Sequence, residues 1–294
     1  MSPVISIILP TYNCALYLGQ AIDSVIAQTF SDWELLIVDN HSDDGTEKII
    51  AAYDDERISN FSIHNNGIIA ASRNLALNHA RGEWVAFLDA DDYWDKDKLR
   101  ACLEKGEQGF DLVYHPMSML YNSRSGFRRK STKSRQLKHP VFRDLMTRGN
   151  PIVNSSVLVR TAKLAEINFL DEDPAIRTSE DYDAWLKLSL NSERFGYILT
   201  NYGVYRVHET SASNALDKTV PHETVITRHI GLLDEKDQLK SRAMLHYIRG
   251  RKYFAEKHYD KARQQLSKAV KDLDKALFAA GILFLFLARL RTIL

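Results

Sequence analysis

The sequence predicts an α/β fold: a doubly wound, mainly parallel sheet followed by a C-terminal α-helical appendage. Over the first half of the chain, short apolar segments alternate with segments whose apolar residues recur at helical spacing, as expected when helices connect parallel strands. Beyond about residue 218 the pattern is helical throughout. We therefore expect two domains, residues 1–215 and residues 216–294.

The elements can be assigned in chain order. The expected strands are residues 4–9, 34–38, 58–63, 84–88, 112–115, 154–160 and 197–205. The expected helices are residues 18–26, a segment that opens at Ile49, residues 69–80, a segment after Asp95 and a segment that begins at Thr178. Residues 122–139 hold seven basic residues and no acidic one, and we expect them to form a mobile loop.

Composition excludes several classes of protein. The 294 residues are 45% hydrophobic and carry a formal net charge of +1, which argues against nucleic acid as the main partner. Two cysteines, Cys14 and Cys102, give no disulfide framework and suit a reducing compartment. The first residues lack the basic segment and apolar run of a signal peptide, so we expect a cytoplasmic protein.

Polar clusters follow three of the expected strands, at residues 10–13, 39–44 and 89–92. In doubly wound sheets, ligands bind beyond the carboxyl ends of the strands near the point where the strand order reverses, so we expect these clusters to face one crevice. No Gly-x-Gly-x-x-Gly follows the first strand, which argues against a dinucleotide cofactor. The absence of a Gly-Lys-Ser/Thr loop excludes the P-loop nucleotide hydrolases.

The acidic cluster contains Asp89, Asp91 and Asp92 and directly follows the apolar segment that begins at Trp84. Like charges at a strand end repel each other, and Mg²⁺ or Mn²⁺ would relieve the repulsion because both ions take oxygen ligands and share them with phosphates. The alternative is a solvated acidic turn that caps the helix after Asp95.

Taken together, these motifs resemble those of the family 2 glycosyltransferases, which are inverting enzymes with the GT-A fold. The resemblance covers residues 4–214. The segments that carry it are residues 6–13, 38–40 with 43–46, 72–74 with 80–83, 88–92, Glu180-Asp181 with Trp185, and 205–208.

The resemblance implies a nucleotide site. Pro10, Tyr12, Asp39 and Arg73 match positions that hold the base, usually uracil, and Asp89 matches the acid beside the ribose. An aromatic ring can stack on a base, and a carboxylate can accept a hydrogen bond from its ring N–H. The alternatives are a loop-packing role for Tyr12 and a surface ion pair for Arg73.

The resemblance also implies a divalent cation, Mn²⁺ or Mg²⁺. Asp91 matches the acid that binds the metal bridging the diphosphate, and Asp92 is an additional acid whose role stays open. His208 matches a histidine that closes over the site and reaches the metal or the diphosphate; the alternative is an ordinary exposed or core histidine. Arg206 could neutralise the diphosphate, and residues 209–214 are a candidate lid.

Asp181 matches the catalytic base, which must lie within hydrogen-bond reach of the attacking acceptor hydroxyl. Thr178 and Asp181 also fit a capping box, in which Asp181 would only satisfy a helix N-terminus. Glu180 is a possible supporting acid, and Trp185 is either a packing residue or a platform for the acceptor.

The C-terminal end contains thirteen apolar residues, 276–288, followed by Arg289 and Arg291. This run is shorter than the ~20 residues that span a bilayer. We expect a helix that lies in the interface of an anionic membrane, with packing on the body or homodimerisation as alternatives.

The sequence thus predicts a metal-dependent inverting enzyme that moves a hexosyl or N-acetylhexosaminyl group from a nucleotide diphosphate donor, UDP-linked in our interpretation. The expected acceptor is a glycan or a lipid-linked glycan, as in surface polysaccharide assembly at the inner face of the membrane. One alternative is a sugar nucleotidyltransferase, which should carry a Gly-rich basic loop where residues 10–13 stand. The other is a catalytically idle scaffold, against which the intact acids argue.

Overall fold

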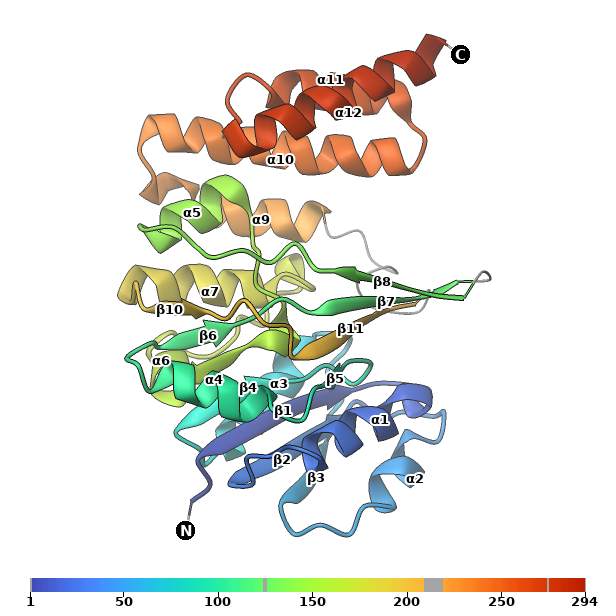
Figure 1. Cartoon of the computed structure of the whole chain (residues 1–294), viewed down its shortest axis with the longest axis vertical. Coiled ribbons are helices and arrows are strands. Elements are labelled where there is room, and N and C mark those ends of the chain that lie inside the picture. The colour runs from blue at the N-terminus through green and yellow to red at the C-terminus, as the bar shows by residue number, and fades with distance from the viewer. Residues whose placement is uncertain (1, 124–125, 209–218, 274, 294) are drawn as a thin grey trace. The chain divides into compact units, whose positions relative to one another are not determined.

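The computed structural model describes the backbone of residues 2–123, 126–208, 219–273 and 275–293 (Figure 1). Contacts group the chain into two compact units. The first unit comprises residues 1–137 and 151–217, and the second comprises residues 138–150 and 218–294. Residues 138–150, which the sequence-based division places in the first domain, thus group with the C-terminal helices.

The first unit is built on a seven-stranded sheet. Its strand order is β10-β6-β9-β4-β1-β2-β3. The strands are β1 (Ile5–Thr11), β2 (Trp33–Asp39), β3 (Ile58–Ser62), β4 (Trp84–Phe87), β6 (Leu112–Tyr114), β9 (Leu158–Arg160) and β10 (Phe195–Tyr197). All pairs are parallel except the two that β9 makes, which are antiparallel. The predicted mainly parallel α/β sheet is confirmed.

Helices connect these strands, as the alternating pattern predicts. They are α1 (Ala15–Ile26), α2 (Thr46–Ala51), α3 (Ile69–His79), α4 (Lys98–Gly106), α6 (Thr161–Glu166) and α7 (Glu180–Asn191), with single 3-10 turns at Asn154–Ser156 and Pro174–Ile176. Leu18, Ile22 and Val25 of α1 are completely buried in a core that also contains β1 and β2. Their predicted helical spacing therefore marks the face of α1 that packs on the sheet.

The sheet contains the expected reversal of strand order. Strand β1 lies between β2, the next strand in sequence, and β4, so the chain adds strands first on one side of β1 and then on the other. In doubly wound sheets a crevice opens at such a point, outside the carboxyl ends of the strands. The residues that follow β1, β2 and β4 are the three polar clusters of the sequence.

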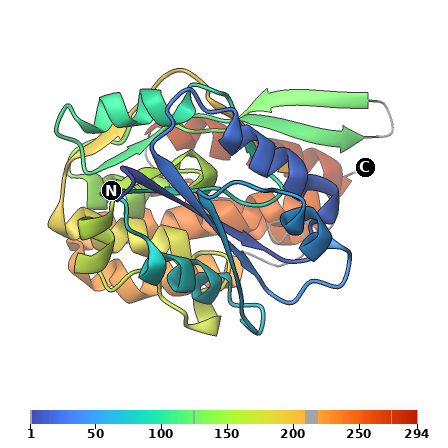
Figure 2. The same ribbon diagram turned by 90° about the horizontal axis from the view of Figure 1, so that it is seen from below.

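A second, four-stranded sheet has the order β5-β11-β7-β8, with β5 at Tyr93–Trp94, β7 at Ser118–Ser123, β8 at Gly126–Ser131 and β11 at Gly203–Val207. The prediction of a mobile loop over residues 122–139 is wrong for β8, which forms an antiparallel hairpin with β7 (Figure 2). An isolated hairpin is marginal in water, but β7 also pairs with β11, so tertiary context supplies the stability that the polar sequence does not indicate. The strand expected over residues 197–205 is two strands, β10 and β11, in different sheets.

The second unit is helical. It contains α5 (Val141–Arg148), α9 (Thr219–His229), a 3-10 turn (Ile230–Leu232), α10 (Glu235–Ala255), α11 (Tyr259–Ala269) and α12 (Lys275–Ile293). Arg143 of α5 forms an ion pair with Asp237 of α10, and Ser241 Oγ of α10 donates to the Met146 carbonyl at 2.7 Å. The hydrogen bonds from Arg143, aided by Lys240, lower the pKa of Asp237 to about 2. These contacts explain why α5 belongs with the C-terminal helices.

No helix in the described ranges has both the length and the apolar character to cross a membrane.

Candidate functional site

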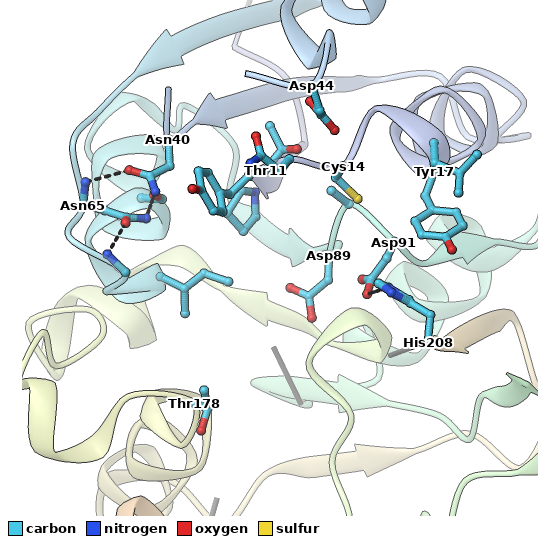
Figure 3. A pocket seen from close by; sticks show the side chains of 18 of the residues that line it. Thr11, Cys14, Tyr17, Asn40, Asp44, Asn65, Asp89, Asp91, Thr178 and His208 are labelled. Atoms are coloured by element: carbon cyan, nitrogen blue, oxygen red, sulfur yellow. Dashed lines mark hydrogen bonds and ion pairs between the residues drawn. The ribbon is translucent and has the colours of Figure 1, made fainter. Parts of the chain in front are cut away.

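A cavity of about 760 Å³ opens where β1, β2 and β4 end (Figure 3). The three predicted polar clusters contribute to its wall through Pro10, Thr11, Tyr12, Asn13, Asn40, Asp44, Asp89, Ala90 and Asp91. The wall also includes Arg177 and Thr178, which precede α7, and Tyr205 and His208, which belong to β11 and its end. The expected meeting of the strand ends at one crevice is therefore confirmed.

Asp91 and His208 point toward each other in this cavity (Figure 3). The distance from Asp91 Oδ2 to His208 Nε2 is 2.9 Å, and the imidazole ring lies 4.8 Å from the ring of Tyr17. Burial and the neighbouring charge of Asp89 raise the pKa of Asp91 against the opposing effect of the His208 hydrogen bond. The structure thus brings together the two residues predicted to bind a metal.

Asp92 and Arg206 stabilise the acidic turn, residues 89–92, from outside the cavity wall. Asp92 is buried and its Oδ1 accepts the backbone N–H of Arg206 at 2.9 Å. Burial, together with the charges of Asp91 and Asp89, raises the pKa of Asp92 well above its usual range. The Arg206 guanidinium donates to the Asp91 carbonyl at 3.0 Å and lies 4.4 Å from the centre of the Tyr17 ring. Neither Asp92 nor Arg206 is part of the cavity wall, so both support the turn, and direct contact of Arg206 with a diphosphate stays a prediction.

Arg73 connects the acidic turn to the start of α7. Its Nη2 donates to Asp89 Oδ1 at 2.7 Å, and its Nη1 donates to Glu180 Oε1 at 2.5 Å. Arg73 is only 3% exposed, so the surface ion pair considered for it does not apply. Burial alone would lower the pKa of the guanidinium, but the charges of Asp89 and Glu180 outweigh burial and raise it. The predicted contact of Arg73 with a nucleobase stays untested, because Arg73 is not in the cavity wall.

Asp181 is the second residue of α7, next to Glu180. Its Oδ1 accepts the backbone N–H of Tyr182 at 2.7 Å, and its charge contributes to the raised pKa of Arg73. The capping box does not form: Ser179, not Thr178, occupies the N-cap position and makes no side-chain cap. Thr178 instead has φ +73°, and its buried Oγ1 finds no hydrogen-bond partner in the described part of the chain. The Thr178 capping box is therefore absent, but Asp181 does satisfy one N–H of the first turn of α7, so its role as a base stays a prediction.

Of the residues predicted to hold the base, some line the cavity and others do not. Pro10 and Tyr12 line the cavity, and Tyr12 is 60% exposed. Asp39, at the end of β2, accepts hydrogen bonds from the backbone N–H and the hydroxyl of Ser42, at 3.0 and 2.5 Å. Asn40 rather than Asp39 is in the cavity wall. The role of Asp39 thus stays a prediction.

Trp185 is completely buried, and its ring meets the ring of Phe87 edge-on at 6.2 Å. This placement fits the packing role rather than the acceptor platform. The candidate lid at residues 209–214 lies outside the described residues.

Arg177 is a wall residue that the sequence analysis did not identify. A Cβ built on Gly67 would lie 2.8 Å from the central carbon and from both terminal nitrogens of the Arg177 guanidinium. Three equal distances mean that the flat face of the guanidinium rests on this glycine, whose φ of +77° a side chain rarely adopts. Arg177 forms no ion pair with an acidic side chain of the described residues, so its N–H groups can meet a ligand in the cavity. A single arginine before a helix carries no signal that sequence reasoning could have used.

The side chains present can be tested against a divalent cation. No group of three His, Cys, Asp or Glu side chains in the described ranges is arranged to hold a metal by itself. Asp91 and His208 nevertheless supply an oxygen and an imidazole nitrogen, and Mn²⁺ accepts both ligand types. Mg²⁺ and similar ions are often bound by one or two protein ligands and complete their coordination with phosphate and water. The pair therefore fits a cation that is shared with a bound diphosphate.

Comparison with known proteins places the chain among sugar-transferring enzymes. Residues 6–167 match the family model described as Glycosyl transferase family 2. The chain is 31% identical to a glycosyltransferase of Bacillus subtilis, EpsE, over 71% of this chain and 74% of that one.

Two further relatives match over shorter stretches. TuaG of Bacillus subtilis, whose name assigns it to teichuronic acid biosynthesis, is 45% identical over 35% of this chain and 41% of its own. WfgD of Escherichia coli is named as a UDP-Glc:α-D-GlcNAc-diphosphoundecaprenol β-1,3-glucosyltransferase, and it is 40% identical over 33% of this chain and 38% of its own. The chain thus spans less than half the length of these two relatives.

Solved structures share the fold. S. aureus TarS 1–349 in complex with UDP-GlcNAc has a TM-score of 0.66 and 21% identity, covering 99% of this chain and 88% of that one. The mannosyltransferase PcManGT from Pyrobaculum calidifontis, in complex with GDP-Man and Mn²⁺, has a TM-score of 0.64 and 18% identity, covering 99% of this chain and 85% of that one. At these identities the likeness concerns the fold, and it agrees with the expected GT-A architecture.

Proposed function

Because the chain belongs to glycosyltransferase family 2, we propose that it transfers a hexosyl or N-acetylhexosaminyl group from a UDP-sugar, with inversion, to a glycan or lipid-linked acceptor. The observation that carries the proposal is the single cavity in which Asp89, Asp91 and His208 meet. Through Arg73, the same acidic turn is joined to the start of α7, where Asp181 stands. The names of TuaG and WfgD support an acceptor in surface polysaccharide assembly.

The donor nucleotide is proposed to lie along the wall formed by Pro10, Tyr12 and Asn40. The exposed ring of Tyr12 can stack on a base, and Asp39, oriented by Ser42, can accept from a ring N–H. The UDP-GlcNAc complex of TarS supports a uridine nucleotide, whereas the GDP-Man complex of PcManGT shows that this fold also accepts guanine. The identity of the base is therefore the first property to measure.

The cofactor in this proposal is Mn²⁺ or Mg²⁺, held by Asp91 and His208. Such an ion supplies stabilisation of the negative charge that grows on the leaving diphosphate. The protein's own contribution is to hold these two ligands in place: the Arg206 guanidinium donates to the Asp91 carbonyl, and the Asp92 carboxylate accepts the backbone N–H of Arg206 in β11. His208 is also packed against Tyr17.

Asp181 is proposed to act as the base. Its carboxylate would take the proton of the acceptor hydroxyl while that hydroxyl attacks the face of the sugar opposite to the diphosphate. The Arg73–Glu180 ion pair fixes the first turn of α7 relative to Asp89, and with it the position of Asp181.

The test is calorimetric titration of UDP, GDP and CDP into the protein, with MnCl₂ and with EDTA. We expect tight binding of UDP only when the metal is present, and Asp91→Asn should lose that metal dependence. Asp54→Asn, at an exposed position outside the cavity wall and outside the three polar clusters, is the matched control. UDP binding of equal strength with MnCl₂ and with EDTA would refute the metal assignment, and stronger binding of GDP or CDP would refute the uridine donor.

A further inference from the structure

Helix α12 is apolar on both of its faces. Its inner face packs within the second unit, where Leu285 and Ala288 are buried and Leu285 joins a cluster with Tyr247 and Leu266. Gly281 lets the helix approach closely, because a Cβ at this position would lie 3.0 Å from Leu273. This face accounts for part of the apolar run.

The outer face is equally apolar. Five large side chains of α12 are between 43% and 56% exposed: Phe278, Ile282, Leu283, Phe286 and Leu290. Four of them, at positions 278, 282, 286 and 290, are spaced by four residues and therefore lie along one side of the helix. A helix at a protein surface normally carries polar residues on its outer side, but residues 277–288 contain none. We call these five residues the outer stripe.

The charge carried by α11 and α12 favours one occupant for the outer stripe. Residues 259–293, which comprise α11 and α12, carry seven basic and three acidic side chains. Lys261 and Lys268 of α11 are exposed, as is Lys271, which follows the helix. A second copy of this chain would bring the same positive charge against itself, whereas a bilayer containing anionic lipids offers both an apolar layer and opposite charge.

We propose that the outer stripe inserts into the interfacial region of an anionic membrane, with the helix lying in the membrane plane. The side chains of the outer stripe would enter the boundary between head groups and acyl chains, and the basic residues would contact the head groups. The outer stripe shares no residue with the nucleotide cavity, so the inference does not depend on the proposed reaction. It would bring the enzyme to the surface where a lipid-linked acceptor resides.

The experiment is flotation of the full-length chain with vesicles of phosphatidylcholine alone and of phosphatidylcholine mixed with phosphatidylglycerol. We expect binding to the anionic vesicles only, weakened by high salt because the charge contribution is screened. Phe286→Asp and Ile282→Asp should each reduce binding at least about tenfold, since each removes an inserting side chain and adds a charge that anionic lipids repel. Leu239→Asp on α10 is the matched control, because Leu239 is 48% exposed but does not belong to the outer stripe.

Circular dichroism and UDP titration of each variant show whether it is folded and whether its nucleotide site is intact. Vesicle binding that is unchanged in both outer-stripe variants would overturn the proposal, as would a wild-type chain that does not float with anionic vesicles. A concentration-dependent dimer that Ile282→Asp dissociates, in a chain that ignores vesicles, would assign the outer stripe to a second copy instead. A wild-type chain that does not bind UDP would count against the proposed function but not against the proposed membrane contact of the outer stripe.

Discussion

The buried ammonium group of Lys98 offers a quantitative test of the packing that connects α4, through Trp94 and Ser155, to Asp89. This first residue of α4 is fully buried, and its ammonium group donates to the Val157 carbonyl at 3.1 Å and lies 4.0 Å from the centre of the Trp94 ring. Trp94 donates in turn to the Ser155 carbonyl, and the Ser155 hydroxyl accepts the N–H of Asp89. Lys98 makes no ion pair with an acidic side chain in the described part of the chain, so burial lowers its pKa from 10.5 to about 8.

This pKa makes the stability of the protein depend on alkaline pH. A fall from 10.5 to about 8 corresponds to a cost of about 3 kcal/mol for holding the charged form inside the folded protein. Between these two pKa values the unfolded chain keeps the proton that the folded chain releases, so the free energy of unfolding should rise with pH. The expected gain from Lys98 is about 2 kcal/mol between about pH 7 and about pH 9.5.

The assay is urea denaturation of the wild-type chain and of Lys98→Met at several pH values in this range. Other titrating groups are common to both proteins, so the free energy of unfolding of Lys98→Met minus that of the wild-type chain isolates Lys98. This difference should fall by about 2 kcal/mol between about pH 7 and about pH 9.5, because only the wild-type chain gains stability from Lys98. Lys48→Met, at an exposed lysine, should differ from the wild type by the same amount at every pH. A pH-independent difference for Lys98→Met would show that the ammonium group is hydrated in solution, and the reasoning from burial would fail.

Three substitutions test the site. Asp181→Asn should keep UDP binding and lose transfer by about 10²–10⁴-fold, measured as UDP release, and near-normal turnover would remove Asp181 from the chemistry. Arg73→Met should lower the free energy of unfolding by about 3–5 kcal/mol in urea denaturation, because it leaves Glu180 buried without its partner. Lys163→Met, which breaks an exposed ion pair with Glu166, should lower it by less than about 1 kcal/mol. Equal losses in the two variants would contradict a stabilising role for the buried ion pair. Arg177→Gln should weaken UDP binding about tenfold or more in calorimetry, since charged hydrogen bonds to the ligand are lost, and unchanged affinity would mean that Arg177 only packs on Gly67.

The strands and helices around the cavity could be predicted because local sequence determines them. Mainly apolar segments such as residues 5–9 are buried on both faces of a parallel sheet, and the polar residues after them lie at its carboxyl edge. The same reasoning correctly brought Asp89 and Asp91 together with Pro10 and Tyr12.

What could not be predicted depends on partners that are distant in sequence. Arg73 meets Glu180 across 107 positions, and nothing near either residue indicates the pairing. Strand β8 has a polar, basic sequence, and it is ordered by β7, which pairs with β11 from a much later part of the chain. The grouping of α5 with the C-terminal helices likewise rests on Arg143 and Asp237, which no local pattern connects.

The placement of α5 has a consequence for synthesis of the protein. Helix α5 is translated about ninety residues before α10, with which it shares an ion pair and a hydrogen bond. At ~5–20 residues per second this interval is roughly 5–20 seconds. During that time Phe142, Leu145 and Met146, buried in the finished protein, await their packing partners on the nascent chain. The ribosome-bound intermediate should therefore be the form most prone to aggregation, and a chain shortened before α10 would keep that defect permanently.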